Sequence, residues 1–317
     1  MELKDLRIVF MGTPEFAVAA LQKLVEAGCH VVGVITAPDK AAGRGMQLQQ
    51  SAVKKYAVEK GLRILQPEKL KDQAFLEELR SLQAHLQVVV AFRMLPELVW
   101  NMPPMGTINL HGSLLPQYRG AAPINWAIIN GEKETGVTTF KLKHEIDTGD
   151  ILLAEKISIA DDETAGELHD KMKEAGANLL LRTVEAIAKG EIKEVSQDDW
   201  SDTDGRTSSA LKHAPKIFTE TCLIDWNRPV KEVHDLVRGL SPYPAAFTKF
   251  QGKNLKIFKA EKIKGLGSSI RPGNFETDKA TFLRFACNDG YLNILELQLE
   301  GKKRMAVADF LRGYHFA

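Results

Sequence analysis

The chain has 317 residues, of which 44 % are hydrophobic and 26 % charged, and a formal net charge of +1. These values are typical of a globular protein and exclude a disordered chain, a fibre or a disulfide scaffold. The length suits about two domains, each with its own core. No apolar run approaches the roughly 20 residues that cross a bilayer, and residues 1–5 lack the apolar core of a signal peptide. We therefore expect a cytosolic protein with no membrane contact.

The N-terminal part of the chain alternates β-branched runs with segments of helical period. This pattern predicts a Rossmann-like α/β domain with a parallel sheet and crossover helices. In chain order, the sequence predicts a strand at 7–11, a helix that starts near Pro14 and ends at Gly28, strands at 30–36, 86–92 and 107–111, an antiparallel pair at 136–143 and 151–159, and a helix at about 164–189.

Residues 196–209 are rich in Asp, Ser, Thr and Gly and have no apolar period, which is typical of a linker. Beyond them we expect an amphipathic helix at 229–240 and strands at 246–250, 255–262, 281–287 and 291–299. Short strands with glycine-containing turns predict a small five-stranded barrel of the OB type. The predicted domains are therefore an α/β domain at 1–206, which includes the linker, and an OB-like β-barrel domain at 207–317.

The charges are unevenly divided between these two parts. Residues 207–317 carry 18 Lys and Arg against 11 Asp and Glu, whereas residues 1–206 carry 24 against 30. Clustered basic residues raise the local potential that attracts phosphates. The second domain is therefore expected to meet a polyanion.

Cysteine and histidine spacing offers neither a disulfide framework nor a metal site. Cys29, Cys222 and Cys287 are odd in number and far apart, so buried, unreactive thiols are expected. The histidines other than His111 are scattered, and structural or exposed roles are expected for His30, His85, His144, His169, His213, His234 and His315.

Asn109 and His111 stand two residues apart at the end of a predicted strand, so their side chains project from the same face. Ligands bind at the carboxyl ends of strands in open parallel sheets. A core histidine is the alternative, but an asparagine beside it is costly to bury without partners. The pair is therefore interpreted as catalytic.

Residues 145–150 form an acidic, turn-forming loop between two predicted strands. An aspartate in such a loop is ordinarily a turn cap. If the loop folds back over His111, Asp147 can hold the orientation and tautomer of the imidazole and stabilise its charged form. Asp150 is the second candidate for this role.

Two loops have the composition of binding segments. Residues 113–123 mix apolar and polar side chains with Pro and Gly and can line a pocket at the strand end, although plain packing of Leu114 and Leu115 is the alternative. Residues 36–55 carry Lys40, Arg44 and two further lysines against a single acid. Such a loop suits the sugar-phosphate backbone of RNA, and a solvated surface loop is the alternative.

Three motifs in this order resemble the folate-dependent formyltransferases: Asn109-x-His111, Ser113-Leu-Leu-Pro-x-Tyr-Arg-Gly120 and Asp147-Thr-Gly-Asp150. Within that superfamily, the segments 10–16, 38–45, 224–226 and 238–244 are similar to those of the methionyl-tRNA formyltransferases. The resemblance runs nearly the whole chain.

The resemblance implies formyl transfer from 10-formyltetrahydrofolate, a co-substrate, to the α-amino group of methionine on initiator tRNA, for translation initiation and without a metal. It assigns catalysis to Asn109, His111 and Asp147. A monomer is expected. The resemblance further assigns tRNA binding to Lys40 and Arg44, and folate binding to Ser113, Leu114, Leu115, Pro116, Phe92, Arg93, Met94 and Leu95.

Other functions fit the residues less well. A sugar-nucleotide formyltransferase or a formyl hydrolase would share the catalytic motif, but the basic loop and tail favour RNA. An aspartic protease needs two Asp-Thr-Gly copies, and only one is present, at 147–149. Ser113 is in no Gly-x-Ser-x-Gly elbow, and Gly12 alone does not make a dinucleotide fingerprint. A non-catalytic RNA-binding module would leave Asn109, His111 and Asp147 unexplained.

Overall fold

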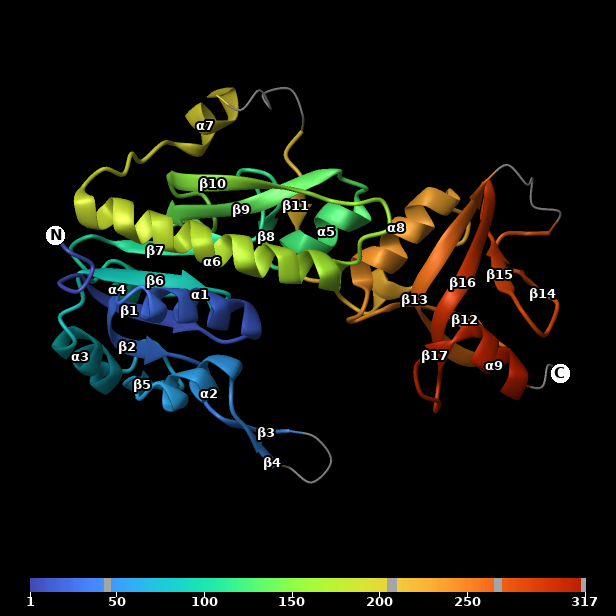
Figure 1. The fold of residues 1–317 in the computed structure, drawn as a ribbon, viewed down its shortest axis with the longest axis horizontal. Coiled ribbons are helices and arrows are strands. Elements are labelled where there is room, and N and C mark those ends of the chain that lie inside the picture. The colour runs from blue at the N-terminus through green and yellow to red at the C-terminus, as the bar shows by residue number, and fades with distance from the viewer. Residues whose placement is uncertain (43–46, 204–209, 265–269, 315–317) are drawn as a thin grey trace. The chain divides into compact units, whose positions relative to one another are not determined.

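The computed structural model describes residues 1–42, 47–203, 210–264 and 270–314. The chain folds into two compact units (Figure 1). Unit 1 comprises residues 1–119, 136–157 and 170–212, and unit 2 comprises residues 120–135, 158–169 and 213–317. Unit 2 thus also contains two short segments that precede the expected domain boundary at 206.

Unit 1 is built on a seven-stranded sheet in the order β10-β9-β7-β6-β1-β2-β5. Its strands are β1 Arg7–Gly12, β2 His30–Ile35, β5 Ile64–Leu65, β6 Leu86–Val90, β7 Thr107–His111, β9 Glu134–Lys141 and β10 Ile151–Ser158. The pairs from β5 to β7 are parallel, and β9 is antiparallel to β7. The predicted parallel-sheet domain is confirmed.

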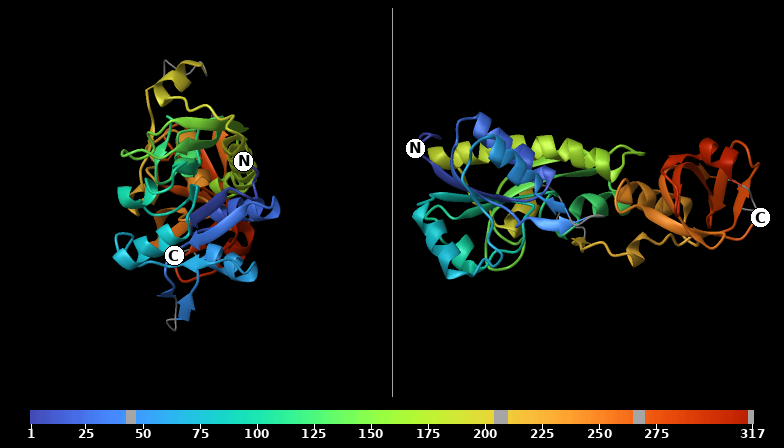
Figure 2. Two further views of the ribbon diagram at one scale, coloured as in Figure 1. Left: turned by 90° about the vertical axis from the view of Figure 1, so that its left-hand side faces the viewer. Right: turned by 90° about the horizontal axis from the view of Figure 1, so that it is seen from below.

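Helices cover both faces of this sheet. The views in Figures 1 and 2 show α1 (Glu15–Glu26) and α6 (Ala165–Lys189) on one face and α3 (Gln73–Ser81) on the other. All five residues of β6 are buried because the strand is covered on both sides. The other helices of unit 1 are α2 Ala52–Glu59, α4 Glu97–Trp100 and α7 Gln197–Thr203.

Helix α7 corrects the linker prediction for residues 196–209, which is wrong for residues 197–203. The main-chain N–H of Asp199 donates to Ser196 Oγ at 3.1 Å and caps the helix, and Asp198 and Asp199 lie in its first turn. Serine is a favoured cap, and acids stabilise the positive end of the helix dipole. The Ser and Asp residues that suggested a linker therefore start helix α7.

Unit 2 contains an antiparallel half-barrel, which confirms the predicted OB-like domain. Its sheet has the order β12-β13-β16-β15-β14, and β17 pairs with β16. Its strands are β12 Ala246–Phe250, β13 Lys253–Lys264, β14 Phe275–Thr277, β15 Leu283–Ala286, β16 Gly290–Leu299 and β17 Met305–Ala306. The helices α5 Pro123–Ile129, α8 Val230–Leu240 and α9 Val307–Gly313 and the short 3₁₀ turn η1 Glu220–Cys222 complete the unit. In its core, Trp226 stacks on Phe285 with ring centroids 4.7 Å apart.

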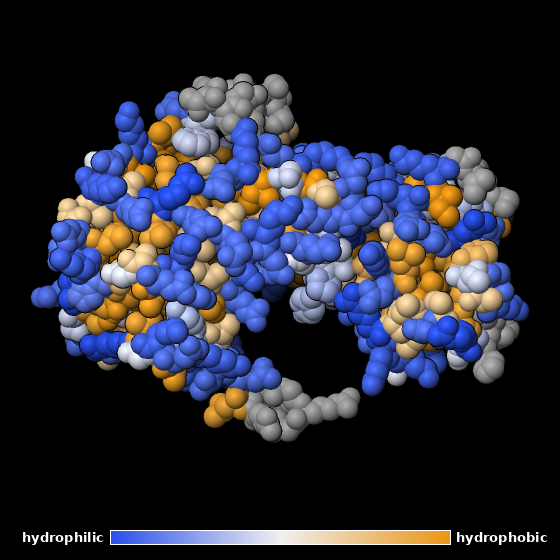
Figure 3. All heavy atoms as spheres, viewed as in Figure 1, coloured by the Kyte–Doolittle hydropathy of each residue, from blue (hydrophilic) through white to orange (hydrophobic). Residues whose placement is uncertain are grey.

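Four small strands lie outside these two sheets. They are β3 Lys40–Ala42, which pairs with β4 Gln47–Gln49, and β8 Arg119–Gly120, which pairs with β11 His213–Ala214. Among the described residues, no helix is long and apolar enough to span a membrane. On the face seen in Figure 3, hydrophilic side chains follow helix α6.

Candidate active site

Strand β7 places Asn109 and His111 inside the sheet. In the ladders on either side, Asn109 stands opposite Val89 of β6 and Phe140 of β9, and His111 stands opposite Thr138. A strand paired on both edges fixes the direction of its side chains. The predicted arrangement of the pair at the carboxyl end of one strand is therefore what the structure shows.

The imidazole of His111 is buried, with 7 % of the residue exposed. Its Nε2 lies 2.9 Å from the main-chain oxygen of Tyr118. Its ring meets the ring of Phe140 edge-on, with centroids 6.4 Å apart and planes at 83°. The ring is thus held by one hydrogen bond and one apolar wall.

The loop after His111 packs against the protein with its side chains inward. Ser113, Leu114, Leu115 and Pro116 are all buried. Leu115 belongs to a small cluster with Phe140 and Ile151. The packing that was the alternative for Leu114 and Leu115 is therefore present, and a folate contact by this segment remains a prediction.

Hydrogen bonds fix the path of this loop. Thr138 Oγ1 donates to the oxygen of Ser113 at 2.7 Å and accepts from the N–H of Leu115 at 3.2 Å. Ser113 Oγ donates to the oxygen of Gln117 at 2.6 Å. Strand β9 and the loop therefore form one tethered wall beside His111.

The acidic turn is held by a residue that the sequence analysis did not single out. The side-chain amide of Gln197, in α7, donates to the oxygens of Asp147 at 2.8 Å and Gly149 at 2.9 Å. Gln197 Oε1 in turn accepts from Arg119 Nε at 3.0 Å. Gln197 is 4 % exposed, and it lies in the segment interpreted as a linker, where no local pattern reveals such a contact.

The backbone of the turn explains its sequence. Asp147 has a φ of 55°, in the left-handed region that aspartate tolerates better than most residues. A Cβ at Gly149 would lie 1.6 Å from the oxygen of Lys141, so only glycine fits there. Asp150, the second candidate, accepts from Lys143 Nζ at 2.7 Å. Within the described residues no hydrogen bond joins Asp147 to the His111 ring, so the role of Asp147 remains a prediction.

The segment after β6 shows mixed exposure. Leu95 packs in the core of unit 1, Phe92 is half-buried, and Met94 is 72 % exposed. The guanidinium of Arg93 donates to the oxygens of Glu68, at 2.8 Å, and Pro67. Arg93 and Met94 are the exposed residues of this segment, and folate binding by the four residues remains a prediction.

The basic loop starts from an anchored aspartate. Asp39 accepts from Lys54 Nζ at 2.5 Å and from Gln66 Nε2 at 2.8 Å. The hydrogen bond from Lys54, followed by that from Gln66, lowers the pKa of the Asp39 carboxyl. Lys40 follows directly and is exposed in β3. Arg44 lies outside the described residues.

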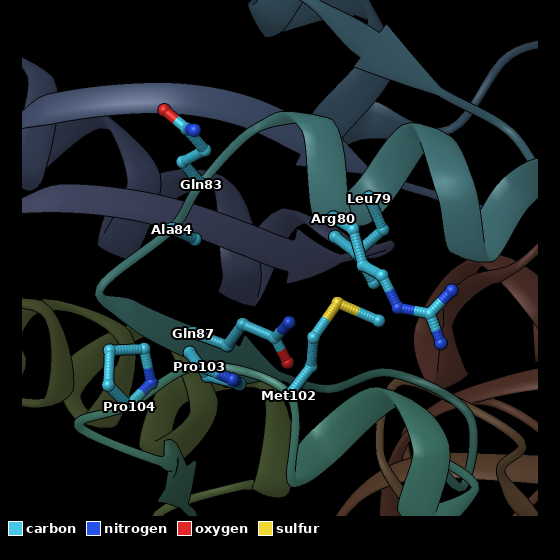
Figure 4. Close-up of a pocket in the computed structure, with 8 residues that line it drawn as sticks. All are labelled: Leu79, Arg80, Gln83, Ala84, Gln87, Met102, Pro103 and Pro104. Atoms are coloured by element: carbon cyan, nitrogen blue, oxygen red, sulfur yellow. The ribbon is translucent and has the colours of Figure 1, made fainter.

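A hollow of about 230 Å³ lies elsewhere in unit 1 (Figure 4). It opens at the amino end of β6, whereas Asn109 and His111 lie toward the carboxyl end of β7, and it contains none of the predicted site residues. It is lined by Leu79, Arg80, Gln83, Ala84, Gln87, Met102, Pro103 and Pro104. Among the described residues, no group of three or more His, Cys, Asp or Glu side chains is placed to hold a metal ion.

Comparison with known families decides the affiliation. Residues 6–184 match the model described as formyl transferase, and residues 216–315 match that of the formyl transferase C-terminal domain. The methionyl-tRNA formyltransferase of Phocaeicola vulgatus is 59 % identical over an alignment of 320 positions that covers 99 % of this chain and 97 % of that protein. The chain belongs to the methionyl-tRNA formyltransferase family. The methionyl-tRNA formyltransferase of Bacteroides fragilis is 55 % identical, with the same shares covered.

A solved structure supports the fold of this methionyl-tRNA formyltransferase family member. HypX from Aquifex aeolicus, solved in complex with tetrahydrofolic acid, matches 96 % of the chain with a TM-score of 0.64 and 19 % identity. The chain spans about half the length of HypX, since the match covers 46 % of that protein. The predicted family and fold are thus confirmed.

Proposed function

We propose that this formyltransferase carries the formyl group of 10-formyltetrahydrofolate to the α-amino group of methionine esterified to initiator tRNA. The observation that carries the proposal is the identity of 59 % with a methionyl-tRNA formyltransferase across 99 % of the chain. The end of strand β7, with the half-buried Asn109 and the buried His111, supplies a place for the chemistry.

In the proposed reaction, the amine attacks the formyl carbon and gives a tetrahedral intermediate. Asn109 donates a hydrogen bond to the developing oxyanion, a contribution of about 10²–10³ in rate. His111 takes the proton of the amine and returns it to the leaving folate nitrogen, which is typically worth about 10²–10⁴-fold. Asp147 stabilises the charged form of His111.

The test is formylation of charged initiator tRNA by the wild-type chain, Asn109→Ala and His111→Ala. We expect kcat to fall by at least about 10²-fold in each variant, while the circular dichroism spectrum and Tm stay near those of the wild type. Near-normal turnover by both folded variants would contradict the assignment.

For folate, we propose that the 113–116 segment contributes main-chain groups, because its side chains are buried, and that Met94 contributes apolar surface. Binding of 10-formyltetrahydrofolate should raise the Tm, since a ligand of the folded state stabilises it.

The nearest rival function is a sugar-nucleotide formyltransferase, and an amino-sugar nucleotide offered as acceptor in place of the tRNA tests it. We expect no formylation of that nucleotide.

For the tRNA, we propose that Lys40 and Arg44 bind the sugar-phosphate backbone. Each phosphate contact adds about one to the slope of log affinity against log salt. Lys40→Gln and Arg44→Gln should each flatten that slope by about one.

We further propose that the protein is a monomer and acts in the cytosol. Sedimentation of the free chain tests its oligomeric state.

A further inference from the structure

The hydrogen bond of His111 fixes which ring nitrogen carries the hydrogen. Nε2 lies 2.9 Å from the main-chain oxygen of Tyr118, and both residues are buried, at 7 % and 5 % exposure. A carbonyl oxygen only accepts, so Nε2 must donate. In the neutral ring the other nitrogen, Nδ1, then holds the lone pair.

Hydrogen bonds hold the chain on both sides of the Tyr118 carbonyl. The N–H of Tyr118 donates to the oxygen of Lys212 at 2.7 Å, and the N–H of Lys212 donates to Gln117 Oε1 at 2.9 Å. Ser113 Oγ fixes the neighbouring carbonyl of Gln117 at 2.6 Å. These bonds fix the peptide before Tyr118, and the pairing of β8 with β11 holds Arg119 and Gly120 directly after it.

The backbone of Tyr118 adopts an unusual conformation that these bonds maintain. Its φ is 59°, in the left-handed region that a bulky residue rarely enters. Such a conformation persists where the surroundings over-determine it, and it is often part of a functional site. Here it aims the carbonyl oxygen at His111.

We infer that Nδ1 is the nitrogen of His111 that exchanges protons with the substrate, and that the main-chain carbonyl of Tyr118 is the positioning group that imposes this choice. The inference rests on the proposed formyl transfer. Among the described residues, Nδ1 has no hydrogen-bond partner, while Nε2 is occupied.

The proton path follows from this choice. As the amine nitrogen bonds to the formyl carbon, the carbonyl electron pair moves to oxygen and an amine proton passes to Nδ1, which makes the ring an imidazolium. When the oxyanion re-forms the C=O bond, the bond from carbon to the folate nitrogen breaks. That nitrogen keeps the electron pair and takes the proton from Nδ1, so the ring returns to its starting state.

The Nε2–H tautomer of His111 also limits the role that Asp147 can have. A carboxylate only accepts, so a contact between Asp147 and Nδ1 would require a hydrogen there and remove the lone pair that takes the amine proton. Tyr118, rather than Asp147, therefore sets the tautomer in the resting enzyme. Asp147 acts on the imidazolium that forms during the reaction, as a nearby negative charge.

The test is nitrogen NMR on the full chain with ¹⁵N-labelled histidine, with His111→Gln used to identify the His111 signals. We expect the neutral His111 ring to show a protonated Nε2 and an unprotonated Nδ1. A protonated Nδ1 beside an unprotonated Nε2, or hydrogens on both nitrogens at the pH of full activity, would overturn the inference. Either result leaves the Asn109→Ala and His111→Ala assays intact, so the two failures are distinguishable.

A matched pair of variants tests the role of Tyr118. Tyr118→Asn and Tyr118→Val both remove the ring, but asparagine tolerates positive φ and the β-branched valine does not. We expect Tyr118→Asn to keep the Nε2–H tautomer, and Tyr118→Val to mix the tautomers and lower kcat at least about 10-fold relative to Tyr118→Asn. Equal tautomers and equal kcat in the two variants would overturn the role of Tyr118. If Tyr118→Val does not fold, the wild-type spectrum still decides which nitrogen works.

Discussion

His111 in unit 1 and His234 in unit 2 are alike in burial and in one contact. They are 7 % and 2 % exposed, and each directs Nε2 at a main-chain oxygen, that of Tyr118 at 2.9 Å and that of Ala260 at 3.1 Å. They differ at Nδ1. The ammonium of Lys262 lies 3.2 Å from Nδ1 of His234, whereas Nδ1 of His111 has no such partner among the described residues. We therefore expect the open lone pair on Nδ1, rather than burial or the carbonyl contact, to make His111 the reactive histidine of the two.

The largest expected effect separates the two histidines directly. His111→Gln should lower kcat by about 10²–10⁴-fold, because the proton transfer is lost. His234→Gln should leave kcat for charged tRNA near the wild-type value and lower the free energy of unfolding. Kinetics and denaturant unfolding of both variants check this pair. A similar loss of kcat in both would break the distinction.

The acidic turn supplies the carboxylate that we assign to the charged form of His111, and Gly149 allows the turn to close. In Gly149→Ala the new Cβ would lie 1.6 Å from the oxygen of Lys141, so the backbone must move. A displacement of about 1 Å in a catalytic group can cost about 10²-fold in rate, and we expect a loss of that order in kcat. Gly313→Ala, at a glycine with open space around it, is the matched control. Equal kcat in the two variants would show that the acidic turn does not contribute to catalysis.

The second histidine predicts a pH dependence of stability. Burial, followed by the charge of Lys262, lowers the pKa of His234 from 6.5 to about 4, while Asp162, Asp235 and the carbonyl of Ala260 act in the opposite direction. The unfolded chain binds this proton below pH 6.5, and the folded chain binds it only near pH 4. The contribution of His234 is thus fully present above the unfolded pKa and lost as the pH falls toward 4. The loss is about 3 kcal/mol, from about 1.4 kcal/mol per pKa unit.

Urea unfolding between pH 7 and pH 4 measures this loss. His234→Gln should show a flatter dependence on pH in that range than the wild type. The exposed His30 gives the control substitution, His30→Gln. Parallel curves for the wild type and His234→Gln would show that His234 takes up no extra proton on unfolding.

The smallest expected effect concerns the residue that holds the acidic turn. Gln197→Ala removes the hydrogen bonds to the oxygens of Asp147 and Gly149, and each unsatisfied buried group costs about 1–3 kcal/mol. Through the loosened turn we expect about a 10-fold fall in kcat and an unchanged KM for charged tRNA. Steady-state kinetics check this, with the nearby Asp198→Ala as control. An unchanged kcat would separate the turn from the reactivity of His111.

The sequence predicted those parts of the molecule that repeat a local pattern. Strand β6 is five buried residues in a row, and β7 carries Asn109 and His111 at the two-residue spacing of one strand face. The barrel strands β12, β13 and β16 were predicted within a few residues, but β14, β17 and α9 were not, because short elements give little periodicity. The elements that the sequence predicted are thus those with a clear local periodicity.

The sequence did not predict the contacts between distant segments. Gln197 reaches the acidic turn over 50 residues of sequence, and Tyr118 reaches His111 through a main-chain oxygen that no side-chain pattern records. In the segment 196–209, Ser and Asp fit both a linker and a helix start, and packing decided for a helix at 197–203. Tertiary contacts therefore supply the remainder of the site.

A double-mutant cycle on the chemical step tests most directly whether Asn109 and His111 act together on the formyl group. Single-turnover rates of formyl transfer to charged initiator tRNA are measured for the wild type, Asn109→Ala, His111→Ala and the double variant. We expect a large loss in each single variant and a loss in the double variant that is smaller than the product of the two single losses, because both side chains act on one transition state. Single variants that transfer the formyl group at the wild-type rate would contradict this expectation.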